Sequence, residues 1–422
     1  MGSEWKPTSL GEVADLLTGY PFKSQYYTQD KGDPRLVGGD NVVQGSLRWD
    51  NVRRWPREMV AGLESYWLAP GDVVLAMDRP WIDAGLKRAA IGVGDVPALL
   101  VQRTARLRGS ERLDTGFLRY VTGSSSFVQY VLGVQTGTAV PHISPSQIRT
   151  YRFLLPPISE QRRIAAVLGA LDDKIELNRK MNRTLEDMAQ ALFKSWFIDF
   201  DGHDDLVDSE LGPVPRGWAV THLLNVVRLL SGGTPKTSEA SYWGGEVKWA
   251  SAKDVSNCSG RYLVDTERSI TTAGLEGSAA KLIPKGAVAV VARGATCGRW
   301  CLFGETVAMN QTCYAIVARR PEHETFIKHA VPPIIALLVQ QAHGSVFDTI
   351  TTSTFEAARL VVPPDSELNR LTTALEPLED RILANVYESR TLTSLRDTLL
   401  PKLISGELRV PEAEQVIEEV LR

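Results

Sequence analysis

The sequence predicts an α/β protein in which two copies of one module are separated by a pair of long antiparallel coiled-coil helices. Three observations lead to this prediction. The chain has 422 residues, more than one ordinary hydrophobic core accommodates, so two or three domains are expected. Its second half repeats its first half at a nearly constant spacing. Each copy ends in a segment of heptad-spaced apolar residues, which indicates a coiled coil.

The internal repeat defines the two modules. Eight positions share an offset of 207 residues: Gly137, Ile143, Pro156, Pro157, Glu160, Leu171, Ile175 and Asn178 recur at Gly344, Ile350, Pro363, Pro364, Glu367, Leu378, Ile382 and Asn385. Upstream, Trp5, Leu10, Val13, Leu17 and Gly19 correspond to Trp218, Leu223, Val226, Leu230 and Gly232. The offset is 214 from Pro70 to Pro284 and 209 from Gln102 to Gln311. The first copy therefore holds a few extra residues, which are expected in a loop.

Short apolar runs within each module indicate buried strands. The runs DVVLAM (72–77) and AVAVVA (287–292) follow Pro-Gly and Pro-Lys-Gly turns, as expected of strands inside a sheet. The runs at 151–155 and 358–362 each stop at a pair of prolines. Because proline cannot continue a sheet interior, these runs are expected to be the last strands of their modules.

A long helix is expected after each proline pair, with Ser159 and Ser366 as N-cap residues. Steps of three, four and seven residues in both segments are typical of a coiled-coil seam. The predicted seam consists of Ile164, Leu168, Leu171, Ile175, Asn178, Leu185 and Leu192 in the first helix, and Leu371, Leu378, Ile382, Asn385, Leu392 and Leu399 in the second. From residue 159 to 197 the first helix would be roughly 58 Å long. An antiparallel pair is expected, because the second module returns the chain between the helices.

Asn178 and Asn385 interrupt the two seams at equivalent positions. A buried asparagine lowers stability but penalises slipped registers, so one interpretation makes both residues register pins. The alternative places both at the edge of the seam, in water, and the sequence favours neither. An antiparallel pair would hold the two modules at its opposite ends, an arrangement that suits two half-sites on one DNA duplex.

The charge distribution permits a nucleic-acid partner without indicating one. The net charge is −3, yet residues 1–150 carry 17 Lys and Arg against 15 Asp and Glu, and residues 213–360 carry 15 against 11. Both modules are thus mildly basic, and the acidic excess lies in the predicted helical segments. There is no apolar run of the roughly 18 residues that a membrane span requires. The N-terminal residues show no signal-peptide pattern, so a cytoplasmic location is expected.

The helical segments and the start of the second module resemble the specificity subunits of type I restriction–modification systems. The resemblance is carried by LLPPISEQRRIAAVLGALDDKIELNRK (154–180), FKSWFIDF (193–200), GPVPRGW (212–218) and LLPKLISGELRV (399–410). It extends from Trp5 to Val410 and is weak inside the modules. It implies target-recognition domains at 1–155 and 212–362. It also implies a first helical region, a spacer helix plus linker, at 156–211, and a second with a C-terminal tail at 363–422.

The resemblance also implies a function. Each target-recognition domain would read one half of a split, asymmetric site in double-stranded DNA. The helix pair would set the gap between the halves and dock two methyltransferase (modification) subunits, which methylate adenine with S-adenosylmethionine. Motor–nuclease (restriction) subunits that use ATP and Mg would join some such complexes. This chain would itself be non-catalytic, bind no cofactor and contact no membrane.

The motifs of an independent enzyme are missing from the sequence. It contains neither the Asn-Pro-Pro-aromatic stretch of an amino-methyltransferase nor a G-x-x-x-x-G-K-[ST] phosphate loop. Glu246-Val247-Lys248 has the E-x-K spacing of a metal-dependent nuclease, but no Pro-Asp partner precedes it, and we interpret it as a solvated strand edge.

Cysteine and histidine do not form a recognisable metal-binding pattern. Cys297, Cys301 and Cys313 have no counterpart in the first copy and no fourth ligand at zinc-finger spacing, so buried free thiols are expected and no metal site. His323 and His329 stand among polar residues and are expected on the surface.

Candidate DNA contacts are chosen from residues that can bond base edges or phosphates. They are Lys23, Arg79, Lys87, Arg88, Gln102, Arg103, Thr138, His142, Lys236, Lys253, Arg293, Arg299, Asn310 and Gln311. Gln102-Arg103 and Asn310-Gln311 occupy matching places, although these amides would equally serve to cap a strand. Lys23 and Lys236 lie in matching loops that contain Gly and Pro, which suits phosphate contacts.

Thr138 and His142 precede the last strand of the first module and would either reach DNA or pin the turn.

Two other functions of the chain stay open. The chain could be an interaction scaffold whose coiled coil is only a spacer, or the specificity subunit of another methyltransferase-based defence system.

Overall fold

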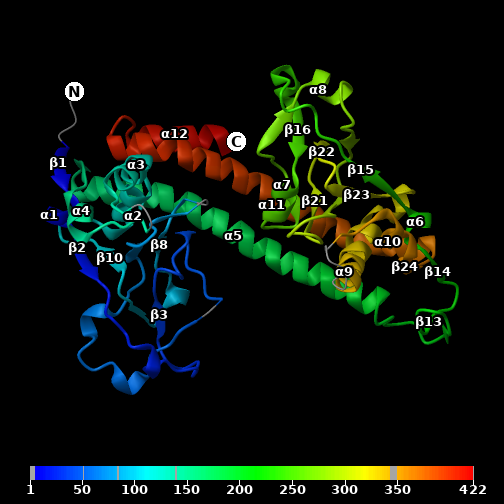
Figure 1. Ribbon diagram of the computed structural model, residues 1–422, viewed down its shortest axis with the longest axis horizontal. Helices are drawn as coiled ribbons and strands as arrows, with labels where there is room; N and C mark the ends of the chain where they lie inside the picture. Colours follow the sequence, from blue (N-terminus) through cyan, green and yellow to red (C-terminus); the bar gives the residue numbers. More distant parts are fainter. Residues whose placement is uncertain (1–4, 51, 83–84, 138–139, 343–348, 422) are drawn as a thin grey trace. The chain divides into compact units, whose positions relative to one another are not determined.

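The computed structural model describes residues 5–50, 52–82, 85–137, 140–342 and 349–421. The chain forms two compact units, unit 1 (Met1–Lys174 with Leu392–Arg422) and unit 2 (Ile175–Thr391) (Figure 1). Both boundaries fall within long helices, so each unit combines one strand-rich domain with parts of two helices. Among the helices in these described ranges, none has both the length and the apolar character needed to traverse a bilayer.

Unit 1 is organised around a five-stranded sheet. Its strand order is β2-β10-β5-β8-β4. The strands are β2 (Asp15–Thr18), β10 (Thr104–Arg108), β5 (Val73–Ala76), β8 (Arg88–Ala90) and β4 (Gln44–Gly45). All four residues of the central strand β5 are buried, which explains its uninterrupted apolar run. The edge pair β4–β8 is parallel and the other pairs are antiparallel.

The remaining elements of the unit 1 domain surround this sheet. β1 (Lys6–Ser9) pairs with β11 (Arg152–Leu155), β3 (Arg35–Val37) runs parallel to β9 (Ala98–Leu100), and β6 (Trp81–Ile82) pairs with β7 (Gly85–Leu86). The helices are α1 (Leu10–Val13), α2 (Thr115–Gly123), α3 (Ser125–Val134) and α4 (Pro145–Thr150). Short 3₁₀ turns lie at Ser24–Tyr26, Arg57–Met59, Glu64–Tyr66 and Val93–Asp95.

Unit 2 contains a sheet of the same design. Its strand order is β15-β23-β20-β21-β17, and its edge pair β17–β21 is again parallel. The strands are β15 (Val227–Ser231), β23 (Cys313–Ala318), β20 (Val288–Val291), β21 (Trp300–Phe303) and β17 (Tyr262–Leu263). The two sheets thus correspond strand for strand, so the repeat in the sequence is a repeat of the fold.

The other elements of the unit 2 domain include a second sheet. Its order is β18-β16-β22-β19, with β18 (Arg268–Ile270), β16 (Trp243–Ala250), β22 (Val307–Met309) and β19 (Leu282–Ile283). β14 (Ala219–His222) pairs with β24 (Arg359–Val362), and β12 (Leu206–Val207) with β13 (Val214–Pro215). The helices are α6 (Leu223–Val226), α7 (Ala252–Asn257), α8 (Thr272–Glu276), α9 (Glu324–Ala342) and α10 (Thr352–Ala357), with 3₁₀ turns at Ala240–Tyr242 and Pro321–His323.

One pair of repeated glycines has a clear steric reason. A Cβ atom on Gly19 would lie 2.0 Å from the carbonyl oxygen of Val101, and one on Gly232 would lie 2.2 Å from that of Met309. Both distances are far below van der Waals contact. In each unit, the chain that leaves the first sheet strand therefore passes too close to another segment for any side chain to fit.

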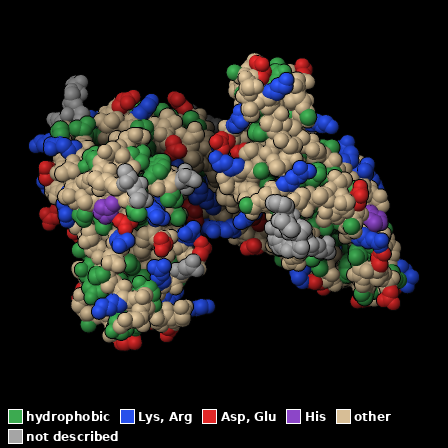
Figure 2. All heavy atoms as spheres, in the orientation of Figure 1, with side chains coloured by type: hydrophobic (Ala, Val, Ile, Leu, Met, Phe, Trp, Pro, Cys, Tyr) green, Lys and Arg blue, Asp and Glu red, His purple; other side chains and the backbone are tan. Residues whose placement is uncertain are grey.

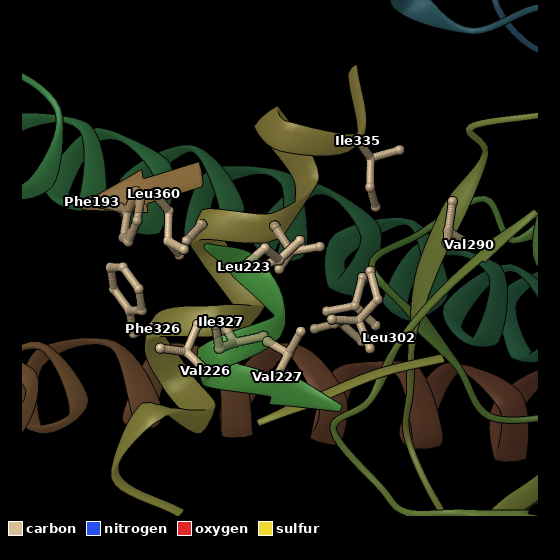
Figure 3. Close-up of a cluster of buried hydrophobic side chains, with 14 of the residues drawn as sticks. Phe193, Leu223, Val226, Val227, Val290, Leu302, Phe326, Ile327, Ile335 and Leu360 are labelled. Atoms are coloured by element: carbon tan, nitrogen blue, oxygen red, sulfur yellow. The ribbon is translucent and has the colours of Figure 1, made fainter. Parts of the chain in front are cut away.

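The core of unit 2 joins its domain to the long helices. The ring of Phe193 in the first long helix packs with that of Phe326 in α9, and both belong to one buried cluster with Ile327 of α9 and Leu223 of α6 (Figure 3). Val290 and Leu302 from the central sheet strands belong to the same buried cluster. Burial of large apolar side chains from both sources makes this part of the helix pair continuous with the domain core.

The two long helices begin one residue earlier than the serines predicted as N-caps. α5 spans Ile158–Phe197 and α11 spans Asp365–Ser405, followed by α12 (Val410–Leu421). The carbonyl of Pro157 accepts the amides of Glu160 and Gln161, and that of Pro364 accepts the corresponding pair in α11. The N-cap prediction for Ser159 and Ser366 is therefore wrong. The second proline of each pair occupies that position, because its fixed backbone angle suits a helix start.

Most of the predicted seam is buried. In unit 1 this applies to Ile164, Leu168, Leu171, Leu392 and Leu399, and in unit 2 to Ile175, Asn178, Leu371, Ile382 and Asn385. Leu185, Leu192 and Leu378 are partly buried against the unit 2 core. Within unit 2 the helices are antiparallel, because Asn178 contacts Glu388 whereas the later residue Asn182 contacts the earlier Ile382.

The two seam asparagines form a polar layer with residues of the opposite helix. Asn178 Nδ2 donates to Glu388 Oε2 at 2.8 Å and to Ser389 Oγ at 3.3 Å. Asn385 Nδ2 donates to Asn182 Oδ1 at 2.8 Å. Asn178 is 0% exposed and Asn385 1% exposed, which rules out the alternative that they lie at the seam edge in water. Buried polar side chains can form these hydrogen bonds in only one axial register of the two helices, so they favour that register.

Candidate nucleic-acid interface

Three separate segments meet at one end of the central strand of unit 1. The amide of Met77, just after β5, donates to the carbonyl of Arg103 at 2.9 Å, and the carbonyl of Met77 accepts the amide of Ile143 at 2.9 Å. The amide of Arg79 donates to Pro141 at 2.7 Å. We call this junction of residues 77–79, 102–103 and 141–143 the β5 corner. It brings four sequence-predicted contacts together: Arg79, Gln102, Arg103 and His142.

A carboxylate connects the side chains of the β5 corner. Asp78 Oδ2 lies 3.1 Å from Arg103 Nη1, and Asp78 Oδ1 lies 2.6 Å from His142 Nδ1. The Arg103 side chain is 73% exposed, against 27% for that of Asp78. Most of the guanidinium thus faces solvent while one of its nitrogens is held. Asp78 is not among the residues predicted from the sequence, because nothing local to it indicates these partners.

The backbone at this corner adopts an uncommon conformation. Arg79 has φ 44° and Arg103 has φ 65°, in the left-handed region that side chains other than glycine rarely adopt. In the described ranges Phe200 is the other non-glycine residue with positive φ. Holding a residue in this backbone conformation costs on the order of 1–3 kcal/mol of folding free energy, and such residues often lie at functional sites. Two of them beside one exposed ion pair therefore make the β5 corner a candidate functional surface.

Lys87 lies beside the corner and Arg88 does not. Burial lowers the pKa of Lys87, an effect opposed by the carboxylate of Asp40 and reinforced by the charge of Arg48. Arg88 instead donates from Nη1 to the carbonyl of Arg119 at 2.9 Å. Desolvation there lowers the pKa of Arg88 to about 10. Arg88 is thus placed as a structural contact beneath α2 rather than at the exposed corner.

The other unit 1 candidates are loop residues. Lys23 and Gln102 are exposed, and the structure gives neither side chain a partner among the described residues. The amide of Gln102 donates to Tyr20 at 2.9 Å, which fixes the backbone but leaves its side chain accessible. Thr138 lies outside the described residues.

Unit 2 builds the same corner with different side chains. Ala292 repeats the bonds of Met77: its amide donates to Thr312 at 2.9 Å, and its carbonyl accepts the amide of Ile350 at 2.9 Å. By this correspondence Arg293 occupies the position of Asp78, and Thr312 that of Arg103. The bridge between Arg293 and Thr349 likewise matches that between Asp78 and His142. The central charge at the corner is therefore reversed between the two domains.

The remaining unit 2 candidates divide between loops and fixed contacts. Lys236 and Arg299 are exposed, as is Arg293. Lys253 Nζ lies 2.8 Å from Glu267 Oε2, an exposed ion pair. Asn310 Oδ1 accepts the amide of Thr312 at 3.2 Å, so this amide holds the turn.

Gln311 corresponds in position to Gln102. Gln102 follows Val101, whose carbonyl would lie 2.0 Å from a Cβ on Gly19, and Gln311 follows Asn310, whose carbonyl would lie 2.3 Å from a Cβ on Gly232. Gln311 Oε1 accepts a hydrogen bond from the hydroxyl of Thr234, which holds the side chain at the surface. On the face shown in Figure 2, Lys and Arg side chains are interspersed with Asp and Glu. On this face the candidates for recognition are thus local groups of residues.

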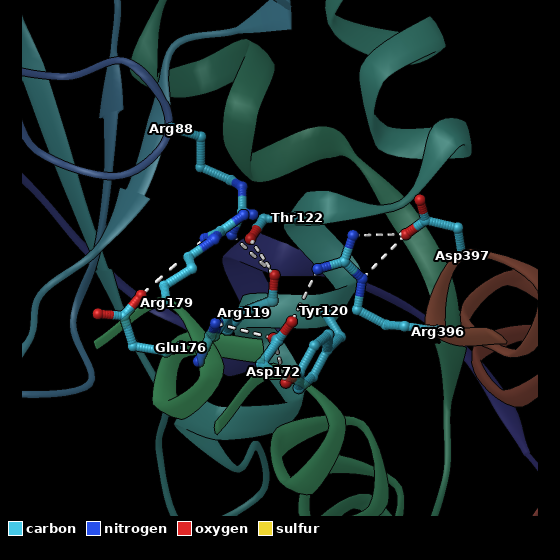
Figure 4. A network of polar contacts seen from close by, with 9 residues as sticks. All are labelled: Arg88, Arg119, Tyr120, Thr122, Asp172, Glu176, Arg179, Arg396 and Asp397. Atoms are coloured by element: carbon cyan, nitrogen blue, oxygen red, sulfur yellow. Dashed lines mark hydrogen bonds and ion pairs between the residues drawn. The ribbon is translucent and has the colours of Figure 1, made fainter. Parts of the chain in front are cut away.

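A second polar site connects the unit 1 domain to its helices (Figure 4). Asp172 of α5 accepts from Arg119 Nη2 at 2.9 Å and from the hydroxyl of Tyr120 at 2.8 Å, both residues of α2. Arg396 of α11 donates to the other oxygen of Asp172 at 2.8 Å. Burial raises the pKa of Tyr120, so its hydroxyl stays protonated and donates. One carboxylate thereby ties both helices to the domain.

Unit 2 has the equivalent joint at the repeat position. Glu379 of α11 lies 207 residues after Asp172, and its side chain is 4% exposed. Glu379 Oε1 lies 2.7 Å from Arg261 Nη2 and 2.9 Å from His329 Nε2, and Tyr262 donates its hydroxyl to Oε2 at 2.6 Å. Although burial opposes ionisation, the hydrogen bond from His329 and the charge of Arg261 lower the pKa of Glu379 to about 2.

Both histidines expected on the surface are buried. His329 is 8% exposed and His323 is 6% exposed, so this prediction is wrong. Burial lowers the pKa of His329, which is consistent with a neutral ring that donates Nε2–H to Glu379. His329 stands 209 residues after Tyr120, the offset that also relates Gln102 to Gln311. The repeat offset of 207 residues relates Asp172 to Glu379 and could have indicated this joint from the sequence. The polar residues that flank His329 in the sequence led instead to the wrong prediction that it is exposed.

The E-x-K segment and the cysteines have structural surroundings. Lys248 of β16 is half-buried, forms an ion pair with Glu305, and donates to the carbonyl of Val264 at 2.7 Å, so it is not a solvated strand edge. Cys301 and Cys313 are buried, and Cys297 is half-buried; all are free thiols. Within the described ranges, no three His, Cys, Asp or Glu side chains are grouped as metal ligands would be.

Comparison with known proteins places these features in a family. The family model described as the type I restriction modification DNA specificity domain matches residues 2–187 and 215–388. The specificity subunit of the type I restriction enzyme MjaIX of Methanocaldococcus jannaschii is 25% identical, over 70% of this chain and 69% of that protein. The specificity subunit of the HindI enzyme of Haemophilus influenzae is 24% identical, over 96% of this chain and 100% of that protein.

A solved structure supports the fold. The S subunit of a type I restriction–modification system from M. genitalium superposes with a TM-score of 0.61 at 16% identity, covering 96% of each chain. The family model matches both modules and most of the first long helix. This chain therefore belongs to the type I restriction–modification DNA specificity family.

Proposed function

We propose that this chain is the DNA-specificity subunit of a type I restriction–modification complex. Its unit 1 domain would read one half of a split site and its unit 2 domain the other. The observation that carries the proposal is the contrast at the two corners. The strand order and the backbone bonds are repeated, but Asp78 is replaced by Arg293. A repeated frame with different surface chemistry suits two readers of unlike sequences.

The helix pair would serve as a spacer and as a docking site for two methyltransferase subunits. α5 has 40 residues and α11 has 41, so each would be about 60 Å long. The polar layer of Asn178, Asn182, Asn385, Glu388 and Ser389 supports a fixed register. The buried joints at Asp172 and Glu379 attach each domain to its part of the helices. Fixed register and fixed joints are what a spacer requires.

The chemistry would belong to the partners. The methyltransferase subunits would transfer a methyl group from S-adenosylmethionine to adenine, and motor–nuclease subunits, where present, would use ATP and Mg. This chain would contribute base recognition alone, without a catalytic residue or cofactor of its own. The lack of an Asn-Pro-Pro-aromatic stretch and of a phosphate loop in its sequence supports this division.

Methylation sequencing of a host with and without this chain, in the presence of the cognate methyltransferase, tests the proposal. We expect adenine methylation at one two-part motif with a constant gap, and none without the chain. Methylation that does not depend on the chain would overturn the proposal. So would purified complexes that bind all duplexes equally, which is the behaviour of an interaction scaffold.

A further inference from the structure

The β5 corner of unit 1 presents one arginine in a defined orientation. Arg103 Nη1 is held 3.1 Å from Asp78 Oδ2, while 73% of its side-chain surface stays exposed. Its other N–H groups therefore remain available to a ligand. A guanidinium offers its donors in a rigid planar fork, so fixing one nitrogen also fixes the direction of the others.

Asp78 is itself held in place. Its second oxygen lies 2.6 Å from His142 Nδ1. The main chain of His142 in turn exchanges hydrogen bonds with Thr136, at 2.9 and 2.7 Å. The carboxylate is therefore a rigid support for Arg103 rather than a mobile surface charge. A preorganised donor loses less conformational entropy when it binds.

The neighbouring carboxylate also discriminates between ligands. A phosphate oxygen that approached Arg103 would meet the negative charge of Asp78 close by, and like charges at such distances repel. A base edge carries no formal charge and meets no such repulsion. Among base edges, O6 and N7 of guanine match the arginine fork with two hydrogen bonds. The corner thus favours a guanine over the DNA backbone.

Unit 2 lacks this arrangement. Thr312 stands where Arg103 does, and Arg293 stands in place of Asp78. Arg293 is exposed and has no acid at the position of its equivalent partner, Thr349. The two domains therefore present different chemistry at the same backbone site, so any preference created at the β5 corner would apply to one half-site only.

We propose that Arg103, supported by Asp78 and His142, is a specificity-determining residue that reads a guanine in the half-site of the unit 1 domain. This rests on the proposed function and deepens it by naming a base and the residue that selects it. Asp78 and His142 act as positioning residues, because they orient Arg103 and need not touch the base.

The test uses methylation sequencing of hosts that carry the whole complex with variant chains. For Arg103→Ala we expect one guanine of one half-site to become degenerate, with discrimination there reduced roughly 10- to 100-fold. The other half-site and the gap should stay unchanged. Arg103→Lys should relax the same position, because a lysine cannot make the two parallel bonds. Asp78→Asn should relax it to a smaller extent.

The control is Arg112→Ala. Arg112 is an exposed arginine of unit 1 beyond the opposite end of β10, so its loss should leave the motif intact. An unchanged motif with Arg103→Ala would overturn the inference. So would a uniform fall in methylation without any relaxed base, which would identify a phosphate contact. In both cases the dependence of a two-part motif on this chain, and hence the proposed function, would still stand.

A measurement on the unaltered protein avoids any folding defect of the variants. Duplexes in which single guanines carry 7-deazaguanine lack the N7 acceptor. We expect one such substitution, in the unit 1 half-site, to weaken binding by the wild-type complex about tenfold. The Arg103→Ala complex should not distinguish the two duplexes. A half-site without guanine on either strand, or wild-type binding that ignores every such substitution, would contradict the inference.

Discussion

The imidazole Nε2 of His329 lies 2.9 Å from a carboxylate oxygen of Glu379, and both side chains are less than 10% exposed. Arg261 supplies the positive charge beside them. In unit 1 the equivalent acid, Asp172, accepts hydrogen bonds from the hydroxyl of Tyr120 and from Arg119 and Arg396. Each joint between domain and helix therefore combines an arginine with a tyrosine hydroxyl on one acid of a long helix.

The first prediction concerns the acid of this joint. Glu379→Ala removes the acid that pairs with the buried Arg261 at 2.7 Å, so we expect unit 2 to lose about 3–5 kcal/mol of unfolding free energy. Glu376→Ala, at an exposed position of the same helix, is the matched control and should change it by less than about 0.5 kcal/mol. Urea unfolding followed by hydrogen exchange of unit 2 amides measures both. Equal effects of the two variants would show that the joint does not stabilise the unit.

The second prediction is acid sensitivity of unit 2. Because the pKa of Glu379 is about 2 in the folded protein and ordinarily 4.5, its contribution is present above pH 4.5 and lost as the pH falls towards 2. The difference corresponds to about 3 kcal/mol. Burial also lowers the pKa of His329 from 6.5 in the folded protein. As the pH falls, the imidazole is therefore protonated in the unfolded state before it is protonated in the folded state. Stability should therefore begin to fall below about pH 6.5.

The variant His329→Gln isolates the histidine contribution. Glutamine keeps a donor for Glu379 but does not titrate, so the variant should lose less stability than the wild type between pH 7.5 and 5.5. The exposed His222→Gln variant is the control and should follow the wild type. Denaturation midpoints of the wild type and both variants at pH 7.5 and 5.5 measure this difference. A steeper pH dependence for His329→Gln than for the wild type would refute this assignment.

The third prediction concerns the polar layer of the helix pair. Asn385→Leu removes the donor to Asn182 Oδ1, so we expect a loss of about 1–3 kcal/mol. Adding Asn182→Leu should recover most of that loss, since the unpaired amide is then gone. A double-mutant cycle in urea gives the coupling energy directly. Purely additive effects would mean that the two amides do not interact.

The fourth prediction follows from the close approach at Gly19. Its alanine variant would place Cβ 2.0 Å from Val101 O, and the backbone must shift at a cost of about 1–3 kcal/mol. Gly133→Ala in α3 has open space around the new methyl group and should be neutral or stabilising by up to about 1 kcal/mol. Thermal unfolding gives the melting temperatures of the two variants, which measure their relative stability. Similar melting temperatures would contradict the steric argument.

The large features of this fold can be predicted from the sequence because each depends on local spacing or on one offset. The heptad pattern identifies α5 and α11, and the offset of 213 pairs Gly19 with Gly232. The same reasoning cannot place a helix start to the residue, because Pro157 and Ser159 are both acceptable there. Nor can it decide whether Asn178 is buried, since that depends on Glu388 and Ser389 of the other helix.

The sites are harder to predict because their side chains come from distant segments. Asp78 is unremarkable in sequence and gains its role from Arg103 and His142. Arg88 has the charge of a DNA contact, yet its guanidinium turns beneath α2. His329 has polar neighbours along the chain and buried ones in space. In each case tertiary contacts, which local composition does not encode, decide the outcome.

The last prediction tests the helix pair as a spacer. Removing residues 178–184 from α5 and 383–389 from α11 deletes one heptad from each helix around the polar layer and leaves the joints at Asp172 and Glu379 in place. Each helix becomes about 10 Å shorter, which corresponds to about three base-pair steps. Methylation sequencing should show the same two half-sequences with a shorter gap. Deleting the heptad from α5 alone brings the seams out of register and should abolish methylation. If the paired deletion altered the half-sequences and kept the gap, the helices would not act as the spacer.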